Sequence, residues 1–65
     1  METLTPPVVD LQDVKRLTTL SRSTIYAFAK EGRFPRPLRI KGTSRTVWKT
    51  AEVLAWLDEN MESAQ

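Results

Sequence analysis

The sequence predicts a small, mostly α-helical domain with three helices and one β-hairpin, and three observations favour this class. The chain has 65 residues, which is enough for one hydrophobic core and too few for two. Three segments carry apolar residues at the three-to-four spacing of a helix. Between the second and third segments, two runs of alternating apolar and polar residues flank a Gly42-Thr43-Ser44 turn. We therefore expect one domain spanning residues 8–62.

The two ends of the chain are expected to lie outside this domain. Residues 1–7 include Pro6-Pro7, which do not enter a helix interior, and they predict a disordered or extended tail. Residues 63–65 are expected to fray. No run approaches the ~20 apolar residues of a membrane span, and the N-terminus lacks the basic and apolar regions of a secretory signal. The sequence indicates a soluble, cytoplasmic protein with no membrane partner.

The first helix is predicted from about Leu11 to Thr18. Asp10 is a suitable N-cap, and an apolar stripe recurs near the helical period. The residues of this stripe are Leu11, Val14 and Leu17.

The second helix follows after about three residues, because Thr18-Thr19 continues a helix poorly and Ser21 is a good cap. It is predicted from Arg22 to Glu31, and Gly32 can take the left-handed conformation that ends a helix. Its inner face consists of Ile25, Phe28 and Ala29. Two short helices this close in sequence describe a helix-turn-helix.

The predicted hairpin spans Leu38 to Lys49 and would form a wing beside the helix-turn-helix. A hairpin alone is marginally stable, so its apolar face is expected to pack on helices. That face is predicted to be Leu38, Ile40 and Trp48. Val47 interrupts the alternation and marks either a bulge or a second contact face.

The third helix is predicted from Ala51 to about Met61, with Thr50 as its cap and Glu52 in its positive first turn. Its apolar stripe is Val53, Leu54, Trp56, Leu57 and Met61. Because Trp48 and Trp56 both lie on apolar stripes, we expect them to pack in the core rather than to stack on a base.

The charges are sorted along the chain. All ten basic residues lie between Lys15 and Lys49, where Glu31 is the one acid, so this block carries +9 although the net charge is +2. A block this cationic attracts a polyanion by counterion release if it gathers on one face. A merely solvated surface gives the same composition.

Candidate DNA-contacting residues fall into two sets. On the second helix, short side chains flanked by basic ones suit close approach to base edges in a groove about 12 Å wide. These are Arg22, Ser23, Thr24, Tyr26, Ala27 and Lys30. The wing and its flanks offer contacts to phosphates through Arg33, Arg36, Arg39, Lys41, Thr43, Ser44 and Arg45.

Arg22 and Tyr26 carry alternatives. Arg22 is a cation in the first turn of a helix, which is mildly unfavourable, and a phosphate or a guanine contact would explain it. Tyr26 either bonds a phosphate or packs beside Phe34. Phe34 and Pro35 are expected to anchor the chain as it leaves the helix.

An enzyme is not expected. The chain has no histidine and no cysteine, and its acids lie at capping positions or on an exposed C-terminal helix. We therefore expect no catalytic residues, no metal site and no cofactor.

Three stretches of this chain, "DVKRLTTLSRSTIYAFAKEGRFPRPLRI", "RTVW" and "EVLAWL", resemble the AlpA-like regulators of phages and prophages, which are relatives of excisionase and MerR-type winged helix-turn-helix proteins. The resemblance implies a recognition helix at Arg22 to Glu31, a wing at Leu38 to Lys49, and a role in transcription or site-specific excision. The chain departs from that family at Thr19, where glycine is common, and we expect a turn that avoids positive φ there. It also departs at Ala27, where long polar side chains are frequent.

The function predicted from these features is sequence-specific binding of double-stranded DNA by a nucleoid-associated transcriptional regulator. One alternative is an excisionase-type recombination directionality factor. Another, from a different class, is a protein-interaction module whose apolar patch is Tyr26, Phe34 and Val47. The expected partners are double-stranded DNA, further copies on tandem sites, and an integrase or RNA polymerase.

Overall fold

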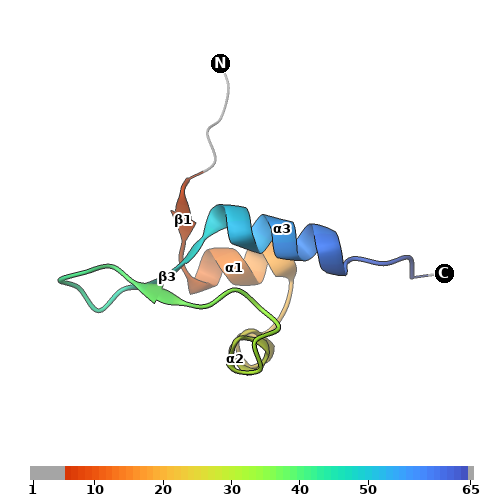
Figure 1. Ribbon diagram of the computed structural model, residues 1–65, viewed down its shortest axis with the longest axis horizontal. Helices are drawn as coiled ribbons and strands as arrows, with labels where there is room; N and C mark the ends of the chain where they lie inside the picture. The colour runs from red at the N-terminus through yellow and green to blue at the C-terminus, as the bar shows by residue number, and fades with distance from the viewer. Residues whose placement is uncertain (1–5, 65) are drawn as a thin grey trace, which may run out of the picture.

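The computed structural model describes residues 6–64 and contains three helices and a three-stranded antiparallel sheet (Figure 1). The strand order is β1-β3-β2, so β3 is central. In chain order the elements are β1 Val8–Val9, α1 Leu11–Thr18, α2 Arg22–Lys30, β2 Leu38–Arg39, β3 Thr46–Lys49 and α3 Thr50–Asn60. This arrangement is a winged helix-turn-helix, and the predicted fold class is confirmed.

Side-chain caps start α1 and α2 where the sequence predicts. The Asp13 amide donates to Asp10 Oδ1 at 3.0 Å, and the Thr24 amide donates to Ser21 Oγ at 3.2 Å. The bounds of α1 agree with the prediction, whereas α2 ends one residue early because Glu31 is its C-cap. Gly32 follows at φ 78°, a conformation that favours glycine.

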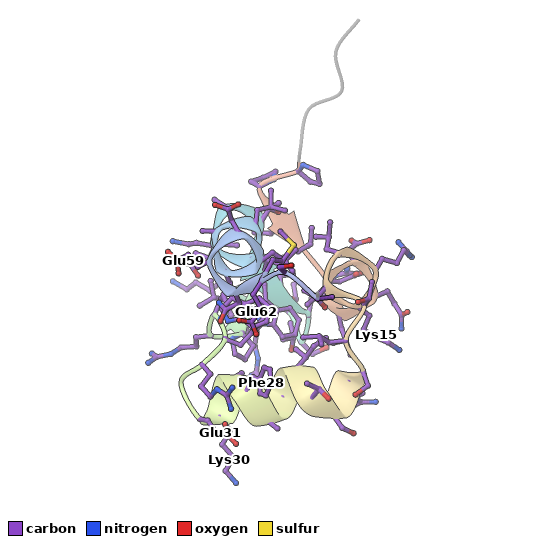
Figure 2. The ribbon with its side chains drawn as sticks, turned by 90° about the vertical axis from the view of Figure 1, so that its right-hand side faces the viewer. Lys15, Phe28, Lys30, Glu31, Glu59 and Glu62 are labelled. Atoms are coloured by element: carbon purple, nitrogen blue, oxygen red, sulfur yellow. The ribbon has the colours of Figure 1, made fainter. Side chains whose placement is uncertain are left out.

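Helix α2 crosses the other two helices and stands out on one side of the molecule. Figure 1 shows α2 end-on below α1 and α3, and the view turned by 90° shows it lengthwise along the bottom (Figure 2). Phe28 points from α2 toward the other helices, while Lys30 and Glu31 point away (Figure 2). One side of α2 is therefore open to a partner.

The core gathers one or two side chains from almost every element. Trp48 of β3, Ile25 of α2, Val14 of α1 and Val53 of α3 are fully buried. Each such side chain contributes roughly 1.5–3 kcal/mol on burial. Partly buried side chains surround this centre, namely Leu11, Leu20, Phe28, Ala29 and Trp56.

Strand β1 was not predicted. Val8 pairs with Lys49 and Val9 pairs with Trp48, and the Thr50 amide donates to the Pro7 carbonyl at 3.0 Å. Two residues are too short to show an alternation in the sequence, and their partners lie at the other end of the chain. Residues 1–5 of the predicted tail lie outside the described residues.

The predicted apolar face of the hairpin is wrong. Leu38 pairs with Val47 and Arg39 pairs with Thr46, and residues directly opposite one another share a face. Leu38 and Val47 therefore lie on one face and Trp48 on the other. Leu38 and Ile40 are exposed, whereas Val47 is buried. The register continues without a bulge, so Val47 marks a second contact face.

The predicted cap of the third helix is also wrong. Thr50 is the first residue of α3, and its N-cap, Lys49, makes no side-chain cap bond. Because α3 continues directly from β3, the pleat that turns Trp48 inward and Lys49 outward also turns Thr50 inward. Thr50 Oγ1 is buried and has no hydrogen-bond partner among residues 6–64.

Three residues predicted to lie on apolar stripes are exposed instead, namely Leu17, Leu54 and Met61. In α1 the residue buried in place of Leu17 is Thr18, which shares a face with Leu11 and Val14 and donates from Oγ1 to the Val14 carbonyl at 2.7 Å. None of the helices in residues 6–64 is long and apolar enough to cross a membrane.

Thr19 takes the left-handed conformation, with φ 61° and ψ 14°, so the prediction that this turn avoids positive φ is wrong. The Thr19 amide donates to the Lys15 carbonyl at 2.7 Å, and the Leu20 amide donates to Thr18 Oγ1 at 3.2 Å. A left-handed residue ends α1 abruptly, which lets α2 begin three residues later. The conformation costs a non-glycine residue roughly 1–2 kcal/mol.

We expect Thr19→Gly to stabilise the protein. Relief of the left-handed strain, about 1–2 kcal/mol, exceeds the added entropy of the unfolded chain, about 0.5–1 kcal/mol. The net gain of up to about 1.5 kcal/mol should raise the midpoint of thermal unfolding by several degrees. Thr19→Ala is the control, since it keeps Cβ and the strain. A glycine variant that melts no higher than the alanine variant would contradict the strain at this position.

Candidate nucleic-acid interface

Five residues form the outer face of α2, and along the chain they are separated by one, three, one and three positions. At about 100° per residue these positions fall on one side of the helix, opposite Ile25. All of them are exposed. They are Arg22, Ser23, Tyr26, Ala27 and Lys30, and we call them the α2 face.

Thr24, predicted as part of this surface, lies off it. Its side chain is half-buried on the flank of α2, toward Phe28. The Ser21 hydroxyl donates to Thr24 Oγ1 at 3.0 Å while accepting from the Thr24 amide. Thr24 therefore belongs to the cap that starts α2.

Tyr26 is held between a cation and the core. The Arg22 guanidinium carbon lies 5.9 Å from the centre of its ring, within cation–π range. On another side the Trp48 ring lies 6.0 Å away, tilted by 57°. Of the two alternatives for the Tyr26 ring, packing beside Phe34 is replaced by packing against Trp48. This contact ties the α2 face to the centre of the core.

Residues 33–37 form the connector between α2 and the wing, and two indole side chains hold it in position. Trp48 donates from Nε1 to the Pro35 carbonyl at 3.1 Å, and Trp56 donates from Nε1 to the Arg33 carbonyl. Phe34 is buried, with its ring edge-on to Trp56 at 4.8 Å between centres. The predicted anchoring role of Phe34 is confirmed.

Arg33 begins the connector and already has internal partners. Its Nη1 lies 3.2 Å from Glu31 Oε1, and its guanidinium carbon lies 4.4 Å from the centre of the Phe28 ring. The exposed ion pair with Glu31 offsets part of the positive charge at this point.

The wing extends beyond the helices as a long loop (Figure 1). Thr43 shapes its tip, because its hydroxyl donates to the Ile40 carbonyl at 2.8 Å and accepts from the Arg45 amide at 3.1 Å. Arg45 Nη2 lies 3.6 Å from Asp10 Oδ2, which links the wing to the start of α1. Ser44 is exposed.

Five exposed cations between Arg22 and Arg45 form no ion pair among residues 6–64. These are Arg22, Lys30, Arg36, Arg39 and Lys41. Within the same residues no hydrogen bond or ion pair joins the α2 face to the wing. The two sets are connected through Trp48, which contacts Tyr26 and the connector.

A comparison with known protein families matches residues 8–61 to the family described as "Prophage CP4-57 regulatory protein (AlpA)". The chain belongs to this family. It is a family of phage-type regulatory proteins that bind DNA and are not enzymes, in agreement with the resemblance seen in the sequence. No curated protein and no solved structure matches the chain.

In this AlpA-family chain, two acids that sequence reasoning did not assign to the interface lie against its cations. Glu31 precedes Arg33 by two residues, so that pair is visible as a local charge pattern. The pair of Asp10 and Arg45 joins residues far apart in sequence, and no local pattern indicates it.

The apolar patch of the predicted interaction module is not formed. Phe34 and Val47 are both buried, and only Tyr26 of the three residues is exposed. The apolar patch predicted for an interaction module is therefore wrong.

Asp10 combines two roles, as the cap of α1 and as the acid partner of the wing. The hydrogen bond from the Asp13 amide is the largest effect and holds the pKa of the Asp10 carboxyl below its usual value. Burial opposes it, and the positive charges of Arg45 and Arg16 lower the pKa further by smaller amounts. A lowered carboxyl pKa in the folded state stabilises the fold above the unfolded pKa, which lies near 4, and this contribution is lost as pH falls through the folded pKa.

We expect the protein to lose stability below about pH 4 partly through Asp10. Asp10→Asn keeps a capping side chain but cannot titrate, so its unfolding midpoint should fall less steeply with acid than that of the wild type. Thermal unfolding of both proteins, followed between about pH 5 and pH 2.5, measures this difference. Parallel curves would show that Asp10 does not contribute to the acid sensitivity.

Proposed function

We propose that this AlpA-family protein is a sequence-specific regulator that inserts α2 into the major groove of double-stranded DNA and lays its wing along the backbone. The α2 face carries the proposal. Small side chains lie between cations at either end of a helix that stands out from the body. A helix with its side chains is about 10–12 Å wide, which fits a groove about 12 Å wide.

Within the α2 face, Ser23 and Ala27 are short enough for the helix to approach base edges closely. Tyr26 presents a polar tip on a ring held by Trp48, so it offers a contact of low conformational freedom. Arg22 is proposed to contact either a guanine or a phosphate, and Lys30 a phosphate.

The connector and wing are proposed to contact phosphates. Arg36, Arg39 and Lys41 have no acid partner among residues 6–64 to replace, so they should contribute most to the affinity for DNA. To bind phosphates, Arg33 and Arg45 must give up their ion pairs with Glu31 and Asp10. Their net contribution to the affinity for DNA should therefore be smaller. Thr43 and Ser44 at the tip are weaker candidates, because the Thr43 hydroxyl already has partners in the turn.

Control of transcription is the role we propose, because the family is described as one of regulatory proteins. RNA polymerase and further copies bound at tandem sites are the partners that such a role involves. An excision factor would use the same surface together with an integrase. Strong bending of the bound duplex, measured by gel mobility with the site at different positions, would favour excision.

Removing the side chain of Arg22 tests its role on the α2 face. Selection from a random duplex pool first supplies a specific site. On that site we expect Arg22→Ala to weaken binding by about 1–3 kcal/mol if Arg22 contacts a base, with a smaller loss on a scrambled duplex. Arg39→Ala should weaken binding to both duplexes alike and lower the slope of log K against log salt by about one.

Fluorescence anisotropy between about 50 and 200 mM salt gives both quantities. Arg16→Ala is the matched control, since it removes an exposed arginine from α1, where it pairs with Asp13. Equal losses on both duplexes for Arg22→Ala would assign Arg22 to a phosphate. Binding that is absent, or that does not change with salt, would contradict the proposed function.

A further inference from the structure

Among residues 6–64, strand β1 leaves one residue whose backbone groups are unpaired at a sheet edge. β1 is an edge strand, and in an antiparallel ladder alternate residues direct both N–H and C=O to the same neighbour. The Pro7 carbonyl accepts from the Thr50 amide, so Pro7 directs its backbone toward β3, and by the alternation Val9, two residues on and opposite Trp48, does the same. The N–H and C=O of Val8, which lies between them, therefore point away from the sheet.

Two adjoining hollows flank this edge. They share Pro6, Thr50 and Leu54, and Leu17 and Val8 extend them on either side. Val8, Leu17 and Leu54 are about two-fifths exposed, which leaves a connected apolar surface open to solvent. β1 lies at the opposite end of the molecule from α2 in both views (Figures 1 and 2). A partner on this surface would not cover the α2 face.

We propose that this surface binds a second copy of the chain, with the two β1 strands pairing antiparallel about Val8. A single residue that offers one donor and one acceptor is self-complementary across a two-fold axis, because each Val8 N–H can donate to the carbonyl of the other copy. The apolar hollows on either side then face each other across the same axis.

The charges at the rim of the two hollows are also compatible with a second copy as the partner. Asp13 and Arg16, an ion pair at 3.0 Å, border one hollow, and Lys49 borders the other. A partner of one charge sign would meet a like charge at this rim, whereas a second copy presents both signs, because Asp13 and Arg16 pair within each copy and Lys49 is exposed to solvent.

The other edge of the sheet does not offer this pairing. On β2, the Ile40 amide donates to the Arg45 carbonyl at 3.2 Å, so by the alternation Leu38 also directs its backbone groups to β3 and the outward groups belong to Arg39. Pairing two β2 strands about Arg39 would place like charges directly opposite each other, which is destabilising. The edge at β1 is therefore the one suited to self-association.

The expected complex is a closed dimer, because an isologous interface uses the same surface on both copies. Two strands of two residues and two shallow hollows form a small interface, so association should be weak, with a Kd above about 10 µM. DNA is not required, since the surface lies away from the α2 face.

Cross-linking at Val8 tests the pairing directly. The chain has no cysteine, so Val8→Cys introduces a single thiol. At the centre of a hydrogen-bonded antiparallel pair the two Cα atoms are about 5.5 Å apart, within disulfide range. Leu38→Cys is the matched control, because Leu38 is 37% exposed and Val8 is 38% exposed, and both lie on edge strands. Under mild oxidation the Val8→Cys protein should form a covalent dimer about tenfold faster or more.

Sedimentation equilibrium on the cysteine-free protein gives a second measurement. With rising concentration the mass should move from 7.5 kDa toward twice that value. Val8→Pro removes the N–H that points away from β3, so it should stay at 7.5 kDa and melt within a few degrees of the wild type. Three results would each overturn the proposal: a wild type that stays monomeric up to about 1 mM, equal cross-linking at both cysteines, or a mass beyond two copies.

Discussion

Trp48 is fully buried in the central strand, and each part of the fold that positions the candidate interface lies against it. Its backbone pairs with Val9 of β1, its ring packs beside Tyr26 of α2, and its indole N–H donates to the Pro35 carbonyl. In so small a chain one large side chain supplies a considerable share of the buried apolar area. The orientation of α2, the path of the connector and the root of the wing therefore depend on one residue.

The cations of the interface differ in how much they are already engaged. Arg33 and Arg45 pair with acids at the surface, whereas the cations of the α2 face and the outer wing have no acid partner among residues 6–64. Exposed ion pairs contribute about 0–1 kcal/mol, so replacing an acid by a phosphate costs the fold little. The ion pairs of Glu31 and Asp10 add a weak restraint on the connector and the wing, and in the proposed complex the unpaired cations would be free to contact phosphates.

The predictions from sequence succeeded where the signal is local. Asp10 and Ser21 start α1 and α2 because a cap side chain bonds an amide three residues on, and Gly32 ends α2 because glycine accepts a positive φ. They failed where the outcome depends on residues far apart in the chain. Strand β1 exists only because β3 pairs with it, and Thr19 is left-handed because the packing of α1 on α2 requires a sharp turn.

The sequence by itself determined the three helices, the presence of a wing, the AlpA-like family and the side of α2 that carries short and basic side chains, because periodicity, caps and charge spacing act within a few residues. Only the tertiary structure decided which face of each strand is buried, that Tyr26 rests on Trp48, and that Asp10 and Glu31 lie against arginines of the interface. These depend on pairing register and on contacts between distant segments. Neither the register nor the distant contacts can be predicted from local sequence, because the free energy that favours them comes from burial of side chains throughout the core.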